Sequence, residues 1–318
     1  MAVTGIQGLM GTDMVTEPST HPDSHGASPL GYGLVLLAGT FWSFGGILVR
    51  EIEVANEWQI LFYRSVTLVA ILFVFFGVRN RGAIIKTFRA AGAVGVIAGL
   101  CLALTFISFI FSLTHTTVAN TLFLLSSGPF MAALLGRIIL GEKVQRATLV
   151  AMMGAVLGIL VMVWEGVATG GLFGDLTALI SALGFAVFTV ALRRRRTVDM
   201  FPAVCWAGIF CTLFTGVLGI FSDHGLAIPV GDVLLSVIYG GAIGCGLTIY
   251  TIGSRSVPSA ELILLSLTEV VLGPIWVWLG IGEVPSGMTL VGGAIVLGAI
   301  TGQAVVGMRR RPPPIGVV

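Results

Sequence analysis

Charged residues are scarce in this sequence of 318 residues. Asp, Glu, Lys and Arg together make up 10% of the chain, whereas hydrophobic residues make up 56% and the mean hydropathy is +1.03. Soluble domains carry about 25% charged residues. A chain so poor in charge cannot present a surface that water solvates, so lipid must be the solvent for most of it. The composition therefore excludes an ordinary soluble domain and predicts an integral membrane protein.

The residue patterns of most enzymes and metal proteins are also missing. The four cysteines lie in apolar segments without CxxC or metal-ligand spacing, which indicates reduced, packed thiols. The histidines are scattered, and neither HExxH nor GxSxG occurs. The stretch 136–142 begins like a phosphate-binding loop, but Glu142 stands where that loop needs its lysine. We therefore predict no enzyme, no metal and no cofactor, with coupling to protons left open.

Ten apolar runs are long enough to cross a membrane, since a span needs about 20 mostly apolar residues to cross about 30 Å of hydrocarbon. The runs are 31–49, 58–78, 91–113, 118–140, 147–164, 172–192, 200–221, 233–253, 258–281 and 288–307. The short loops between them leave no room for a soluble catalytic or ATP-hydrolysing domain. The sequence therefore predicts an all-α membrane protein with ten transmembrane helices.

The basic residues predict the orientation, because Lys and Arg gather in cytoplasmic loops. With the N-terminus inside, the even-numbered loops and the C-terminal tail hold nearly all of the 17 basic residues. The run Arg193–Arg196 fits a cytoplasmic anchor that contacts anionic lipid better than it fits a nucleic-acid site. Residues 1–30 are predicted to be a disordered cytoplasmic tail and 308–318 a basic cytoplasmic tail. We expect a bacterial inner membrane with both termini in the cytoplasm.

Internal repetition divides the spans into two sets of five. LGEKVQRATLV at 140–150 aligns with IGEVPSGMTLV at 281–291, and LLAGTFWSFGGILVR at 36–50 aligns with LISALGFAVFTVALRR at 179–194. Because each set has an odd number of spans, the two sets must insert with opposite orientation. The expected five-helix repeats are 31–164 and 172–307. Inverted repeats of this kind are typical of secondary transporters, whose substrate site lies near the midplane between the halves.

Short motifs recur at matching places in these repeats. Gly141–Glu142 and Gly282–Glu283 each close a span ahead of a glycine-rich one, Gly174–Leu176 opens the sixth span, and Arg64 lies early in the second. In this order the motifs resemble the drug/metabolite transporter superfamily with two EamA-type repeats. The resemblance implies a secondary carrier of small organic solutes, most often an exporter of amino acids or other metabolites.

The ninth span departs from the pattern of that family. Where the second repeat of the family often has Glu-Pro, Glu269 is followed by Val270, and Pro274 comes four residues later, whereas the first repeat keeps Pro129. The departure puts the local kink of the ninth span, and with it the fine geometry of the site, in question.

Two charges lie deep within the predicted spans, Arg64 and Glu269. A charge at the centre of a span costs roughly 2.5–3.5 kcal/mol, so such residues are functional candidates. We predict that Glu269 couples protons or binds an ammonium group and that Arg64 anchors a carboxylate. The competing interpretations are a structural ion pair between them, or an Arg64 side chain that reaches the headgroups. Glu261, near the end of the ninth span, is predicted to be an interfacial group.

Aromatic and amide side chains within the spans complete the predicted binding site. Trp42 and Tyr63 come from spans that line the pathway in the resembled family, and Tyr250 is a further candidate. Asn120 could donate hydrogen bonds to a substrate, whereas Ser126 and Ser127 fit helix–helix contacts better.

These predictions favour a secondary transporter that works by alternating access on a small-molecule substrate in the lipid bilayer. Two other classes stay open: a sensor or scaffold that does not transport, and a membrane-embedded enzyme that modifies lipids. A sensor would have a dry interior with Arg64 and Glu269 paired. The enzyme would need acids, histidine or a nucleophile clustered at one membrane face. A homodimer is left open, and no nucleic-acid partner is predicted.

Overall fold

The computed structural model describes residues 29–80, 84–142, 144–194, 201–221, 225–254, 257 and 259–309. Across these residues the secondary structure is helical, without a strand. Ten segments are long and apolar enough to cross a membrane, which confirms the predicted all-α membrane fold with ten spans. Most of each predicted tail, 1–28 and 310–318, falls outside the described residues, whereas residues 29–30 begin α1 and residues 308–309 end α12. Several of the basic residues used to predict the orientation also fall outside the described residues: Arg81, Lys143, Arg195, Arg196, Arg255, Arg310 and Arg311.

The first five spans lie before residue 170. Their helices are α1 (Pro29–Ser43) with α2 (Gly45–Arg50), α3 (Glu57–Asn80), α4 (Ile84–His115), α5 (Val118–Leu125) with α6 (Gly128–Leu140), and α7 (Arg146–Thr169). The other five spans are α8 (Leu172–Arg194), α9 (Phe201–Phe221), α10 (Val230–Gly253), α11 (Ser259–Ile281) and α12 (Gly287–Arg309). The predicted runs differ from these helices mainly in the third span.

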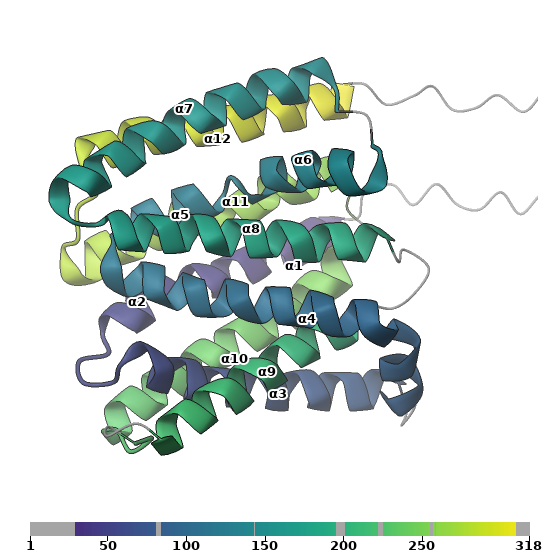
Figure 1. The fold of residues 1–318 in the computed structure, drawn as a ribbon, viewed down its shortest axis with the longest axis vertical. Coiled ribbons are helices and arrows are strands. Elements are labelled where there is room, and N and C mark those ends of the chain that lie inside the picture. Colours follow the sequence, from purple (N-terminus) through teal and green to yellow (C-terminus); the bar gives the residue numbers. More distant parts are fainter. Residues whose placement is uncertain are drawn as a thin grey trace, which may run out of the picture.

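The third span begins earlier than its apolar run because its helix carries a charged first segment. Residues 84–91 of α4 include Lys86 and Arg89, which interrupt the hydropathy pattern, and they precede a non-helical residue at Gly92 with φ 55° and ψ −155°. Residues with a Cβ rarely adopt that backbone conformation. The chain changes direction there, at the far right of α4 (Figure 1).

The fourth and ninth spans differ in continuity. The fourth is interrupted at Ser126–Ser127, just before Pro129, whose ring nitrogen cannot donate a helical hydrogen bond. The ninth, α11, continues as one helix through Pro274. The ninth span, in which Val270 follows Glu269 where the family often has proline, is therefore uninterrupted.

Helix packing follows the same plan in both halves. α4 packs on α8 and α9, and its counterpart α10 packs on α1 and α3. α1 packs on α11 as α6 packs on α8, while α3 pairs with α9 and α7 pairs with α12. Exchanging the two sets of five helices thus leaves the main helix pairs unchanged, whereas weaker contacts such as α3 with α4 and α11 with α12 occur in one half without a comparable counterpart in the other. α7 and α12 form one edge of the bundle, and α3, α9 and α10 form the opposite edge (Figure 1).

Charges of opposite sign gather at the two ends of the bundle. The left end in Figure 1, called here the acidic end, carries Glu51, Glu57, Glu165, Asp175, Asp232 and Glu283. The right end, called here the basic end, carries Lys86, Arg89, Arg137, Arg146 and Arg194. The orientation predicted from the sequence would place the basic end in the cytoplasm.

Candidate functional site

Arg64 lies in α3 inside the bundle, with only 1% of its surface exposed. The carbon of its guanidinium group is 4.7 Å from the ring centroid of Phe106 in α4 and 5.2 Å from that of Tyr239 in α10. At such distances the π-faces attract the cation. The Nε and Nη2 atoms have no hydrogen-bond partner. Because unpaired buried donors are costly, these atoms are suited to bind an oxygen ligand.

The close packing of α3 on α10 holds Arg64 in this position. A Cβ atom at Gly240 would collide with the carbonyl oxygen of Arg64 and would lie 2.9 Å from the Cβ of Thr67. Glycine is therefore required where the two backbones meet. The adjacent residue, Tyr239, is 1% exposed, and its hydroxyl also lacks a partner.

Trp42 and Tyr250, two of the predicted site residues, lie next to each other. Their ring centroids are 5.4 Å apart, between the end of α1 and the last turn of α10. The indole nitrogen of Trp42 is buried without a hydrogen-bond partner. Between them, α1, α3 and α10 thus bring three side chains with buried, unpartnered donor atoms into the bundle: Trp42, Arg64 and Tyr239.

Glu269 lies near the middle of α11 and is half-buried. The helix approaches α1 there: a Cβ atom at Gly39 would lie 3.7 Å from the backbone nitrogen of Glu269. Glu269 and Arg64, both within the described part of the chain, form no ion pair, so the interpretation as a structural pair is not supported. A hollow of about 340 Å³ runs along the same stretch of α11, lined by Leu264, Leu267, Thr268, Val271 and Leu272.

Tyr63 and Asn120 lie elsewhere, toward the acidic end. The hydroxyl of Tyr63 donates to the carbonyl of Leu226 at 2.8 Å. Asn120 is 4% exposed, and its amide donates to the carboxylate of Asp175 and, at 3.2 Å, to the hydroxyl of Thr116. Ser126 and Ser127 donate to carbonyls within their own span. The roles of Tyr63 and Asn120 in substrate binding stay predictions.

An ion pair joins the two halves at the acidic end. Arg50, which ends α2, has its Nε 2.8 Å from Oε2 of Glu283, and its Nη2 donates to the carbonyl of Thr116 at 2.6 Å. The other carboxylate oxygen of Glu283 accepts from the backbone N–H of Val118 at 2.7 Å. Glu283 therefore links the loop after α11 to both α2 and the start of α5.

A second link runs through Asp175, whose side chain is fully buried. Its Oδ1 accepts from Asn120 and, at 3.1 Å, from Thr116. Its Oδ2 has no hydrogen-bond partner. Asn120 also lies 3.4 Å from the hydroxyl of Thr289, which extends the network to α12. Helices α5, α8 and α12 thus meet in one polar cluster.

A third link holds the loop after α2. The carboxylate of Asp232 is 6% exposed and accepts from the backbone N–H groups of Val54 and Ala55 at 3.0 and 2.8 Å. The Gln59 amide donates to the carbonyl of Gly225 at 3.0 Å. Each of these bonds joins a residue of the first half to one of the second.

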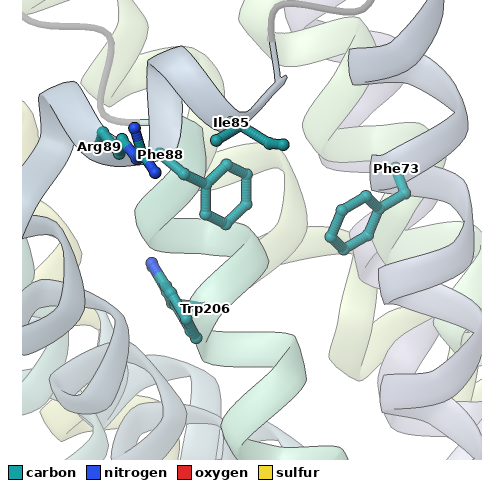
Figure 2. Close-up of a pocket in the computed structure, with 5 residues that line it drawn as sticks. All are labelled: Phe73, Ile85, Phe88, Arg89 and Trp206. Carbon is teal, nitrogen blue, oxygen red and sulfur yellow. The ribbon is translucent and has the colours of Figure 1, made fainter.

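A hollow of about 380 Å³ lies away from Arg64 and Glu269, at the basic end. Its lining residues are Phe73, Ile85, Phe88, Arg89 and Trp206, from α3, α4 and α9 (Figure 2). The lining is apolar apart from Arg89, so it takes no part in the substrate binding and proton coupling predicted for Arg64 and Glu269.

Sequence reasoning missed the partners of the predicted residues. Tyr239 and Phe106 enclose Arg64, yet each looks like an ordinary apolar-span aromatic. Asp175 was noted as part of a motif, but its contact with Asn120 joins residues 55 positions apart. A charged residue close to a span end can be either an exposed interfacial group or a buried partner of another helix. Only the packing of α8 against α5 shows that Asp175 is buried.

Comparison with known proteins places this architecture among transporters. The model of the EamA-like transporter family matches residues 29–164 and again 172–303. The Pseudopaline exporter CntI of Pseudomonas aeruginosa strain UCBPP-PA14 is 24% identical over 275 residues, covering 83% of this chain and 92% of the exporter. An uncharacterized transporter of Helicobacter pylori is 22% identical, covering 76% of this chain and 84% of its own length. A solved crystal structure aligns with a TM-score of 0.61 at 20% identity, covering 88% of this chain and 98% of the other. At that identity the structural likeness shows the fold alone.

Proposed function

The chain belongs to the EamA-like transporter family, and from this premise we propose that it exports small organic metabolites, such as amino acids, by alternating access. That it is a multi-pass membrane protein of transporter type follows from its family and its ten spans. The outward direction is supported by the relative named as an exporter. A transporter family also favours transport over lipid modification.

The central residues support a substrate that carries a carboxylate. Arg64 keeps two unpaired nitrogen atoms, and the hydroxyl of Tyr239 and the indole N–H of Trp42 are unpaired as well. A carboxylate has acceptor oxygens for several such donors. Glu269 would then receive an ammonium group or a coupling proton.

The observation that carries alternating access is the set of polar bonds between the halves at the acidic end. The Arg50–Glu283 ion pair, the Asp175–Asn120 bond and the Asp232 contacts each join one half to the other. Such contacts can break and re-form as two packed halves rock about a central site. The structure would then represent a state closed at the acidic end.

The decisive experiment is transport by purified protein in vesicles, with an amino-acid mixture as the first substrates. We expect Glu269→Gln to insert and purify normally but to lose coupled transport. Glu261→Gln, the same change eight residues away on the same helix, is the matched control and should transport normally. Transport by Glu269→Gln with unchanged pH dependence would contradict the coupling role.

A thermal-shift screen of the same protein against amino acids and related metabolites, across pH, would identify the substrate class. Ligands with a carboxylate should raise the unfolding temperature of the wild type. Arg64→Gln should abolish that shift while Arg64→Lys keeps part of it, because lysine retains the charge but not the planar donor pair. A scaffold without substrate would show no ligand-dependent shift at any pH.

A further inference from the structure

The first segment of α4 differs from the span that follows it. Residues 84–91 precede the non-helical Gly92 and so take their own direction at the basic end (Figure 1). Lys86 and Arg89 are three residues apart, which places them on one side of a helix. Both side chains are exposed. The segment thus presents two cations at the level where the third span enters the membrane.

Next to Arg89 lies the 380 Å³ hollow, whose walls are mostly aromatic. Phe88 is central to it: its ring centroid is 6.1 Å from that of Phe73 and 5.7 Å from that of Trp206. Figure 2 shows the indole nitrogen of Trp206 directed toward the turn that carries Phe88 and Arg89. Three helices therefore form an apolar pocket with a cation at its rim.

We propose that this pocket holds an acyl chain of an anionic phospholipid, whose phosphate contacts Arg89 and Lys86. The pocket opens at the surface of a membrane protein, where lipid tails are the apolar molecules available to fill it. Its apolar lining offers water almost no hydrogen bonds, which disfavours a hydrated pocket. The exposed Arg89 at its rim, with the exposed Lys86 one helical turn away, selects a negative headgroup over a zwitterionic one. This inference concerns the lipid environment and is independent of the proposed transport.

The test uses the full chain in phosphatidylcholine vesicles, with a small fraction of lipid carrying brominated acyl chains that quench nearby tryptophan. Brominated phosphatidylglycerol should quench more strongly than brominated phosphatidylcholine. Each basic residue near a membrane contributes roughly fivefold in affinity for anionic lipid. Arg89→Gln and Lys86→Gln should each reduce the preference for phosphatidylglycerol by about fivefold. Arg137→Gln removes an exposed cation at the same end, outside the pocket, and should leave the preference unchanged.

Trp206→Phe tests the location of the chain while keeping an aromatic wall. The extra quenching by phosphatidylglycerol should disappear in this variant, although mass spectrometry of the intact complex should still detect the retained lipid. Soluble glycerol phosphate should not displace it, because the headgroup alone lacks the chain. Equal quenching by both lipids in the wild type would overturn the proposal. So would extra quenching that survives Trp206→Phe, displacement by glycerol phosphate, or an equal effect of Arg137→Gln and Arg89→Gln.

Discussion

The acidic and basic ends of the bundle use their charges in opposite ways. At the acidic end two carboxylates are buried: Asp175 and Asp232 are 0% and 6% exposed while they accept hydrogen bonds from the other half of the chain. At the basic end Lys86, Arg89 and Arg137 are exposed, and aromatic rings such as Phe76 and Phe201 fill the interior. Three polar links join the halves at the acidic end, where Trp58 also packs on Phe111 and Phe214. Packed rings predominate at the basic end, beside a polar bond from the Tyr32 hydroxyl to Glu261.

The difference follows from side-chain length and from what each charge can bind. A short carboxylate is an acceptor held close to its own backbone, so it can receive N–H groups of a neighbouring loop. Lysine and arginine have long flexible stems and only donors, so they extend toward lipid phosphates. Polar links at the acidic end can be exchanged for water during a conformational change, whereas packed rings resist separation. We expect the two ends to respond differently to substitution.

The largest effect should come from the rings of the basic end. Phe76 is fully buried, and its ring lies nearly parallel to that of Phe201 with centroids 5.3 Å apart. Phe76→Ala should lower the free energy of unfolding by about 3 kcal/mol, because the cavity forfeits packing contacts. Detergent-induced unfolding followed by tryptophan fluorescence measures it. Phe76→Leu, which refills most of the space, should recover more than half of the lost free energy of unfolding. An equally large loss of that free energy in both variants would contradict the packing argument.

Asp232→Ala should have the next largest effect, about 2 kcal/mol, because two backbone N–H groups lose a charged acceptor. Asp232→Asn keeps an acceptor oxygen and should lose about half as much. The same unfolding assay compares the two. If both variants matched the wild type, water would be replacing the carboxylate, and the acidic end would not depend on this link.

The Arg50–Glu283 pair should contribute about 1 kcal/mol, since its side chains are 23% and 18% exposed and are partly screened. A double-mutant cycle with Arg50→Gln, Glu283→Gln and the double variant isolates that coupling. The pair should contribute more to keeping the acidic end closed than to stability. A cysteine introduced next to the pair should therefore react faster with a water-soluble reagent in either single variant. Unchanged reactivity together with zero coupling would remove this pair from the gate.

The smallest effect should come from the exposed cations of the basic end. Arg137→Gln should change the free energy of unfolding in detergent by less than about 0.5 kcal/mol, as is usual for surface positions. A loss comparable to that of Asp232→Ala would mean that the basic end depends on polar contacts as much as the acidic end does, and the comparison would fail.

Much of the architecture could be predicted because membrane spans are defined by local properties. Hydropathy and length located ten helices, and the structure confirms them. The charged segment 84–91 was missed because Lys86 and Arg89 interrupt the apolar run. The continuity of α11 through Pro274 could not be predicted, since neighbouring helices decide whether a proline bends a helix.

The candidate site was predicted in part. Arg64 and Glu269 stand out in the sequence because a charge within a span is rare. The side chains around the site do not stand out in the sequence. The rings around Arg64 come from α4 and α10, and the partner of Asn120 comes from α8. Tyr63 is predicted together with Trp42 because their spans line the pathway in the resembled family, but its hydroxyl donates to the carbonyl of Leu226 toward the acidic end.

The sequence by itself determined the number and order of the spans and the rare charges within them, because lipid imposes a length and a polarity on every crossing segment. Only the tertiary structure decided which polar groups meet. Apolar helices can pack in many pairings with similar contact energies, so the partner of a buried side chain depends on small residues that let two particular backbones approach. Gly240 beside Arg64 is such a residue, because a Cβ atom there would collide with the carbonyl oxygen of Arg64 and keep α10 away from α3.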